Sequence, residues 1–142
     1  LHDVSLQDMR SLILELYDEA IAAMTAAEKT AGGFVADRSP ADFVAFWLYY
    51  RLEGDEAATE ALVARVRRDL DRLDAALLLP WGGIPLEADG VRAPNIWLQL
   101  HFQALFEGLV ASYMPVANLW RLPAEVVGLE DRISWTLDRV AE

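Results

Sequence analysis

The chain has 142 residues and a formal net charge of −11, and this length suits one domain with a hydrophobic core of its own. Cysteine is absent and there are only two histidines, which excludes disulfides and thiolate metal sites and leaves zinc or di-iron chemistry without an obvious ligand set. Because an acidic surface repels phosphate groups and anionic lipid, we expect neither nucleic-acid binding nor binding to a membrane surface.

The first two predicted helices are separated by a glycine pair. The first covers Leu6–Thr30, follows a capping serine at Ser5 and ends before Gly32. The second begins with the cap and first-turn proline at residues 39–40 and is predicted to end at Gly54. Apolar side chains cover nearly all faces of this second helix, so we expect it to be buried on several sides.

Three further helices are predicted over residues 55–79, 95–114 and 123–142. Each is bounded by proline, glycine or a capping residue, and each carries an apolar stripe at helical spacing. Between the third and fourth helices, residues 80–94 hold three prolines and three glycines; we predict a long loop that packs down on the helices. The fold prediction is therefore an all-α, five-helix, bundle-like single domain over residues 1–142.

The strongest acidic cluster lies on the first predicted helix, at Glu15, Asp18 and Glu19. Carboxylates at this spacing on a bundle helix can hold Mg²⁺ or Mn²⁺, as an all-α hydrolase would require. However, these three residues lie opposite the apolar stripe of the same helix, so we expect a solvated face rather than a metal site. A metal-dependent hydrolase is kept as the third hypothesis.

No other cluster predicts catalysis. Four arginines between residues 65 and 72 alternate with acids at i,i+4 spacing, which is typical of a salt-bridged helix surface. His101 lies at the edge of an apolar helix face, and we expect it to be half-buried and hydrogen-bonded. There is no serine elbow and no phosphate-binding loop. We therefore assign no catalytic residue, no metal and no cofactor, and a non-enzymatic protein is favoured over an enzyme.

The first functional hypothesis rests on a surplus of apolar residues. Hydrophobic residues make up 54% of the chain, against about 45–50% in an average domain. The second and fourth helices are both apolar on nearly all sides, whereas a domain of this size surrounds one helix completely. We therefore expect an interaction or scaffold module that forms a homodimer or binds a protein partner, with Trp135 and Val127 at the interface.

The second hypothesis is a small-molecule site between the second and fourth helices, roofed by residues 80–94. Binding pockets of this kind combine apolar walls with a few polar groups. Trp47 and Trp97 are also expected to belong to the core. The predicted ligand-binding residues are Trp47, Tyr50, Trp81, Arg92, Asn95, Trp97 and His101.

Composition also gives an expectation for source and location. One lysine against eleven arginines is typical of a high-GC bacterial genome. No signal-peptide pattern is found, and the longest apolar runs are too short to span a bilayer. We therefore expect a soluble cytoplasmic protein.

Overall fold

The computed structural model describes residues 5–82 and 95–141. Within these residues the chain forms five α-helices, one 3-10 helix and a two-stranded sheet, so the domain is all-α as predicted. None of the described helices has both the length and the apolar character needed to cross a membrane. The elements are α1 (Leu6–Ala31), α2 (Pro40–Tyr49), α3 (Glu56–Leu70), β1 (Ala76–Leu78), α4 (Ile96–Tyr113), η1 (Val116–Asn118), β2 (Leu119–Arg121) and α5 (Leu129–Ala141).

Helices α1 and α4 begin and end close to the predicted residues because local caps fix them. The Ser5 hydroxyl accepts a hydrogen bond from the backbone N–H of Asp8 at 3.1 Å. At the other end of α1, Gly32 adopts φ 75°, a conformation that glycine tolerates without strain. The Asn95 side chain accepts from the N–H of Trp97 at 3.0 Å and starts α4.

Helix α2 is shorter than predicted. It starts at the predicted capping box, in which the backbone N–H of Ser39 donates to the Asp42 carboxylate at 2.8 Å. It stops at Tyr49 rather than at Gly54, since Arg51 takes a left-handed conformation with φ 60°. Asp55 is the N-cap of α3 and has an extended backbone. The chain therefore leaves the helical conformation before α3 begins.

The two strands are the main departure from the predicted helices. Helix α3 ends at Leu70, and part of the segment predicted to extend it to residue 79 forms β1 instead. This strand runs parallel to β2, with Ala76 opposite Leu119 and Leu78 opposite Arg121. The backbone N–H of Leu122 extends the ladder by donating to the oxygen of Leu78 at 3.0 Å. Pairing with a distant segment therefore overrides the helical spacing of the leucines.

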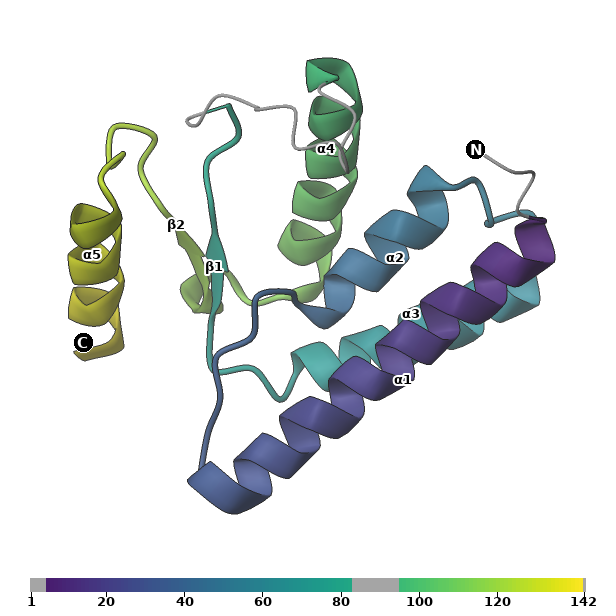
Figure 1. The fold of residues 1–142 in the computed structure, drawn as a ribbon, viewed down its shortest axis with the longest axis horizontal. Helices are drawn as coiled ribbons and strands as arrows, with labels where there is room; N and C mark the ends of the chain where they lie inside the picture. The colour runs from purple at the N-terminus through teal and green to yellow at the C-terminus, as the bar shows by residue number, and fades with distance from the viewer. Residues whose placement is uncertain (1–4, 83–94, 142) are drawn as a thin grey trace.

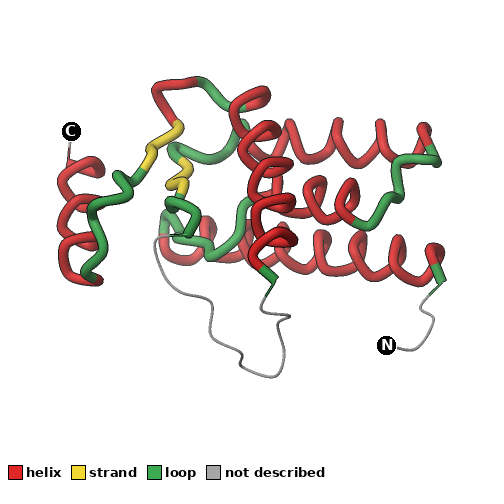
Figure 2. Tube along the Cα trace, turned by 90° about the horizontal axis from the view of Figure 1, so that it is seen from above, coloured by secondary structure: helices red, strands yellow, loops and turns green. Residues whose placement is uncertain are grey.

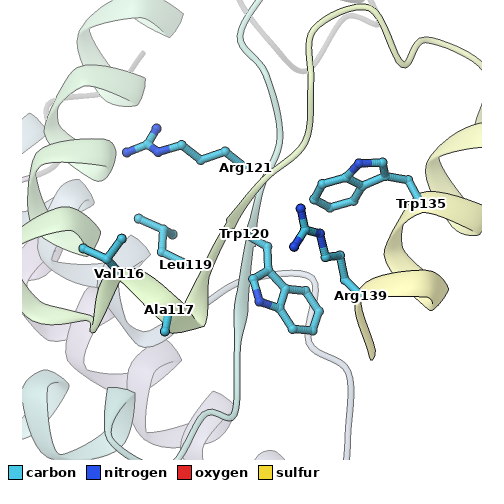
Figure 3. A pocket seen from close by; sticks show the side chains of 7 residues that line it. All are labelled: Val116, Ala117, Leu119, Trp120, Arg121, Trp135 and Arg139. Carbon is cyan, nitrogen blue, oxygen red and sulfur yellow. The ribbon is translucent and has the colours of Figure 1, made fainter. Parts of the chain in front are cut away.

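Helix α5 begins at Leu129, not at the predicted Pro123. Its first helical bond runs from the N–H of Arg132 to the oxygen of Gly128, at 3.0 Å. A side chain at position 128 would meet the Asp131 carboxylate at 2.7 Å, so glycine allows the first turn to fold over it. In both overall views α5 lies beyond the strands, at one end of the molecule (Figures 1 and 2). Figure 3 shows the side chains of α5 and of the segment from η1 to β2 that lie on either side of the space between them.

The core is built around α2, whose first six residues and Trp47 are buried, as the apolar surface of the helix predicts. The Trp47 indole N–H donates to the Thr59 hydroxyl of α3 at 2.9 Å, which satisfies its one polar group. Helices α1, α3 and α4 cover α2 from different sides (Figure 1). The other fully or largely buried apolar residues are Ile13, Tyr17, Met24, Leu52, Leu62, Val66, Leu70, Leu78, Val110, Met114 and Leu122.

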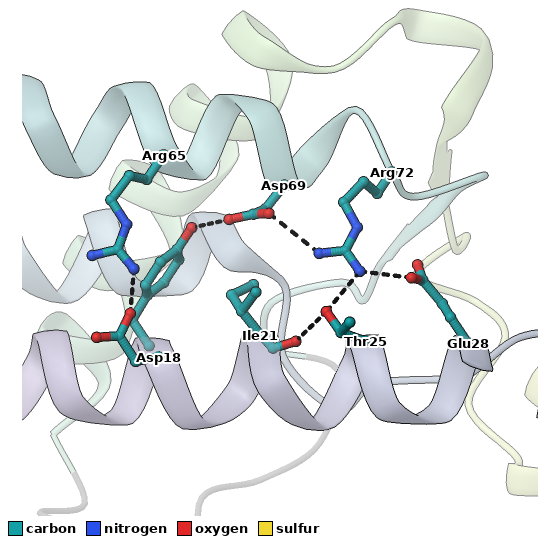
Figure 4. Close-up of polar contacts among 8 residues, drawn as sticks. Asp18, Ile21, Thr25, Glu28, Arg65, Asp69 and Arg72 are labelled. Atoms are coloured by element: carbon teal, nitrogen blue, oxygen red, sulfur yellow. Dashed lines mark hydrogen bonds and ion pairs between the residues drawn. The ribbon is translucent and has the colours of Figure 1, made fainter. Parts of the chain in front are cut away.

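A line of polar contacts joins α1 to α3 along the edge of this core (Figure 4). The buried Tyr17 hydroxyl donates to the Asp69 carboxylate, and burial and this carboxylate raise the pKa of Tyr17 well above its ordinary value. The Arg65 guanidinium pairs with Asp18. Arg72 pairs with Glu28 at 2.7 Å. Arg65 and Arg72, which follows the end of α3, therefore reach across to α1, where the sequence predicted pairs along one helix. Arg72 also pairs locally with Asp69 at 3.3 Å.

We expect Tyr17→Phe to lower the free energy of unfolding by about 1–2 kcal/mol, because the hydrogen bond from the buried Tyr17 to the partly buried Asp69 carboxylate is lost. Urea denaturation followed by circular dichroism measures this change. Tyr113→Phe is the matched control: its hydroxyl makes no hydrogen bond within the described residues, so its loss should have little effect. Equal losses for the two variants would show that the Tyr17–Asp69 bond contributes nothing specific.

Candidate functional site

A pocket of about 540 Å³ lies between α2 and α4, and residues 79–82 line a third side. Its aromatic wall comes from both helices: the rings of Phe46 and Phe102 are 4.6 Å apart, and Tyr49 is 6.1 Å from Phe102. Trp81 also lines the pocket. The volume falls within the range of small-molecule sites, about 300–1,000 Å³.

The charged groups in the described lining of this pocket are positive. Its described lining contains two arginines, Arg38 and Arg132, and no carboxylate. Three amide side chains complete the polar lining: Asn95, Gln99 and Gln103.

The two arginines are held in different ways. The Arg38 guanidinium lies 3.6 Å from the Asp42 carboxylate and 5.2 Å from the centre of the Phe46 ring. Arg132 reaches the pocket from α5, and its Nε donates to the backbone oxygen of Val126 at 2.9 Å. Its Nη2 is buried without a hydrogen-bond partner in the described part of the chain. Such a group normally finds a partner, so Arg132 is the unusual polar residue of the pocket.

The pocket lies where the sequence placed one, but most of its lining differs from the prediction. Of the predicted residues, Trp81 and Asn95 line it. Trp47 is buried in the core, and Tyr50 stacks on Phe46 without reaching the pocket. Arg92 lies outside the described residues.

Trp97 and His101 are more exposed than predicted. Trp97, predicted to belong to the core, is 71% exposed, and all of residues 95–100 at the start of α4 are exposed with it. His101 was expected to be half-buried and is also exposed, with its ring 5.5 Å from that of Tyr49. Neither residue is among those that line the pocket.

Sequence reasoning missed Phe46, Tyr49 and Phe102. A signal for the first two was present, since positions 46 and 49 are three residues apart and share a helix face. The third lies one residue after His101, on a face of α4 that turns toward α2. Only the crossing of the two helices brings these rings together.

The second candidate site is the outer surface of α5. Four apolar side chains at steps of four, four and three residues form a stripe on this helix. Leu129 is 74% exposed, Ile133 50%, Leu137 62% and Val140 67%. We call these four residues the α5 stripe. Val127, one of the two predicted interface residues, is exposed just before the helix begins.

Trp135, the other predicted interface residue, lies on the opposite side of α5 and faces its own domain. It is half-buried, and the Arg139 guanidinium lies 5.2 Å from the centre of its ring. A pocket of about 460 Å³ separates this side of α5 from β2 and η1, and Trp120 lines it together with Trp135 (Figure 3). The inner side of α5 is therefore aromatic and loosely packed, and the aliphatic stripe faces outward.

The acidic cluster of α1 shows no arrangement suited to a metal. Glu15, Asp18 and Glu19 are exposed, and Asp18 is paired with Arg65. No group of three or more histidine, aspartate or glutamate side chains in the described part of the chain could hold a metal ion.

Comparisons with protein families, with characterised proteins and with solved structures gave no match for this chain. The functional argument therefore rests on the pocket between α2 and α4 and on the surface of α5.

The buried Asp42 generates a prediction about pH. Burial raises the pKa of Asp42 above its ordinary value of 3.8, against the hydrogen bonds from Ser39 and the charge of Arg38, which lower it. The folded state therefore holds this proton more tightly than the unfolded state, and the contribution of Asp42 to stability falls as the pH rises from 3.8 through the folded pKa.

Replacing Asp42 with Asn removes this titration and leaves an oxygen that can accept from Ser39. The unfolding free energy of wild type relative to Asp42→Asn should therefore decrease as the pH rises through that window. Urea denaturation at a series of pH values measures the difference, with Asp74→Asn, at an exposed position after α3, as control. A difference that stays constant or grows with pH would contradict the assignment.

Proposed function

We propose that this domain is an interaction module that self-associates, and that two copies meet through the α5 stripe. The carrying observation is that four aliphatic side chains of one helix face outward although the core around α2 is already complete. Isolated exposed apolar residues are ordinary on protein surfaces, but a contiguous helical stripe is typical of an interface.

A second copy is the occupant that best fits this surface. A two-fold axis places the same patch on both partners, so an uninterrupted aliphatic stripe meets an identical one. Charge on the helix itself opposes this approach only weakly: α5 carries three acids and two arginines, a net charge of −1 out of the −11 of the whole chain. A strongly basic partner would find little complementary charge on this helix.

The size of the stripe sets the expected affinity. Full burial of a leucine, isoleucine or valine contributes about 1.5–3 kcal/mol, so the partly exposed side chains of two copies supply on the order of 8–15 kcal/mol. Association itself costs about 4–15 kcal/mol. At the low end of that cost the net gain is about 4–11 kcal/mol, and this range includes the roughly 8 kcal/mol of a micromolar dimer. We take this low cost and expect a dissociation constant in the micromolar range.

The Leu137→Asp variant tests the surface. Sedimentation equilibrium should show a wild-type dimer and an increase of about tenfold or more in the dissociation constant of Leu137→Asp, which would bury a charge at the interface. Leu137 is mostly exposed in one copy, so the variant should fold normally by circular dichroism. Ser134→Asp, on an exposed position off the stripe, should dimerise like wild type. A wild-type monomer at hundreds of micromolar would overturn the proposal.

Salt dependence distinguishes this apolar dimer from an association held by ion pairs. Each copy carries a net charge of −11, so the two copies repel each other through their overall field. The Debye length shrinks from about 10 Å at 0.1 M salt to about 3 Å at 1 M. We therefore expect sedimentation to report a lower dissociation constant at 1 M than at 0.1 M NaCl. Weaker association at 1 M would indicate that ion pairs hold the copies together.

A further inference from the structure

We infer that the pocket between α2 and α4 binds a small carboxylate carried on an aromatic body, with the Arg132 guanidinium as its anchor. The first support is charge. The described lining holds two guanidinium groups and no carboxylate, in a chain that is otherwise strongly acidic. Of the two, Arg38 already has Asp42 beside it, whereas Arg132 forms no ion pair with a carboxylate of the described residues.

The guanidinium of Arg132, which lines the pocket, has hydrogen-bonding capacity that the described residues do not use. Nε is occupied by the Val126 oxygen, and this bond holds the side chain in place. Nη2 is buried and unpartnered among the described residues. The pair of Nη atoms matches the two oxygens of a carboxylate, which arginine binds through two parallel hydrogen bonds. A bound carboxylate would satisfy a buried donor that the described protein leaves without a partner.

The aromatic wall specifies the body of the ligand. Phe46, Tyr49 and Phe102 form a continuous surface from two helices, and Trp81 faces the same space from the segment after β1. Aromatic rings pack against one another in offset or edge-to-face arrangements, and such a pair contributes beyond the area it buries. A cavity of about 540 Å³ holds one ring system with a short acidic arm.

Paired probes test the charge and the ring separately. Isothermal titration calorimetry would compare phenylacetate with phenylacetamide, which has the same ring and no charge, and with inorganic phosphate, which has charge and no ring. We expect phenylacetate to bind at least about tenfold more tightly than either, because charge-assisted hydrogen bonds exceed neutral ones. Equal affinity for phenylacetate and phenylacetamide, tighter binding of phosphate, or no binding of phenylacetate would overturn the inference.

Variants locate the site. Arg132→Gln should weaken phenylacetate binding about tenfold or more, whereas Arg68→Gln, an exposed arginine of α3 away from the pocket, should leave it unchanged. Arg132→Lys keeps the charge but not the two parallel N–H donors, so its affinity for phenylacetate should fall between those of wild type and Arg132→Gln. This variant tests the site if the glutamine variant does not fold. Unchanged affinity in Arg132→Lys and Arg132→Gln would place the ligand elsewhere.

The inference is independent of self-association. Arg132 and the α5 stripe lie on different faces of the same helix, so Leu137→Asp should leave phenylacetate affinity at the wild-type level. A loss of phenylacetate binding in Leu137→Asp, with the fold intact, would mean that the pocket as described for one copy is not the binding site.

Discussion

The burial of most of α2 is the constraint on which the rest of the structure depends. This helix has apolar side chains on nearly all of its faces, and α1, α3 and α4 cover it from different sides. Trp47 shows how fully this is done, since even its indole N–H is satisfied inside by Thr59. The line of polar contacts that includes Tyr17 and Asp69 then joins α1 to α3 along the edge of this core. No described residue of α5 belongs to the buried core.

The structure therefore shows where the surplus of apolar residues that the composition indicates is located. Much of it lies on the described start of α4 and on the outer side of α5, where large apolar side chains are exposed. Helix α5 differs on its two sides: the inner side presents Trp135 and Arg132 to two cavities, and the outer side presents the α5 stripe to solvent. The two proposed sites of the domain thus share one helix without sharing a face.

The sequence predicts the features that local chemistry decides. Ser5, Gly32 and Asn95 fix helix ends through caps that depend on nearby residues alone. It does not predict β1, because the leucines of residues 77–79 continue a helical period until Leu119–Arg121 is known to lie beside them. A helical wheel also shows which residues of α5 share a side but not which side looks inward, and this is why Trp135 was placed at the interface. The pocket was predicted from two apolar helices, whereas most of its lining depends on the angle at which they cross.

The parallel pairing of β1 with β2 has a consequence for the order in which the molecule assembles. The two strands are separated in sequence by the whole of α4, so their ladder closes a long loop and gains only three residue pairs in return. Contacts of such sequence separation form late, after the local helices and the enclosure of α2. Since α5 follows β2 directly, the C-terminal segment docks last. By the same reasoning, the backbone amide hydrogens of this C-terminal segment should exchange with solvent before those of the core. The segment would then unfold locally while the core stays folded.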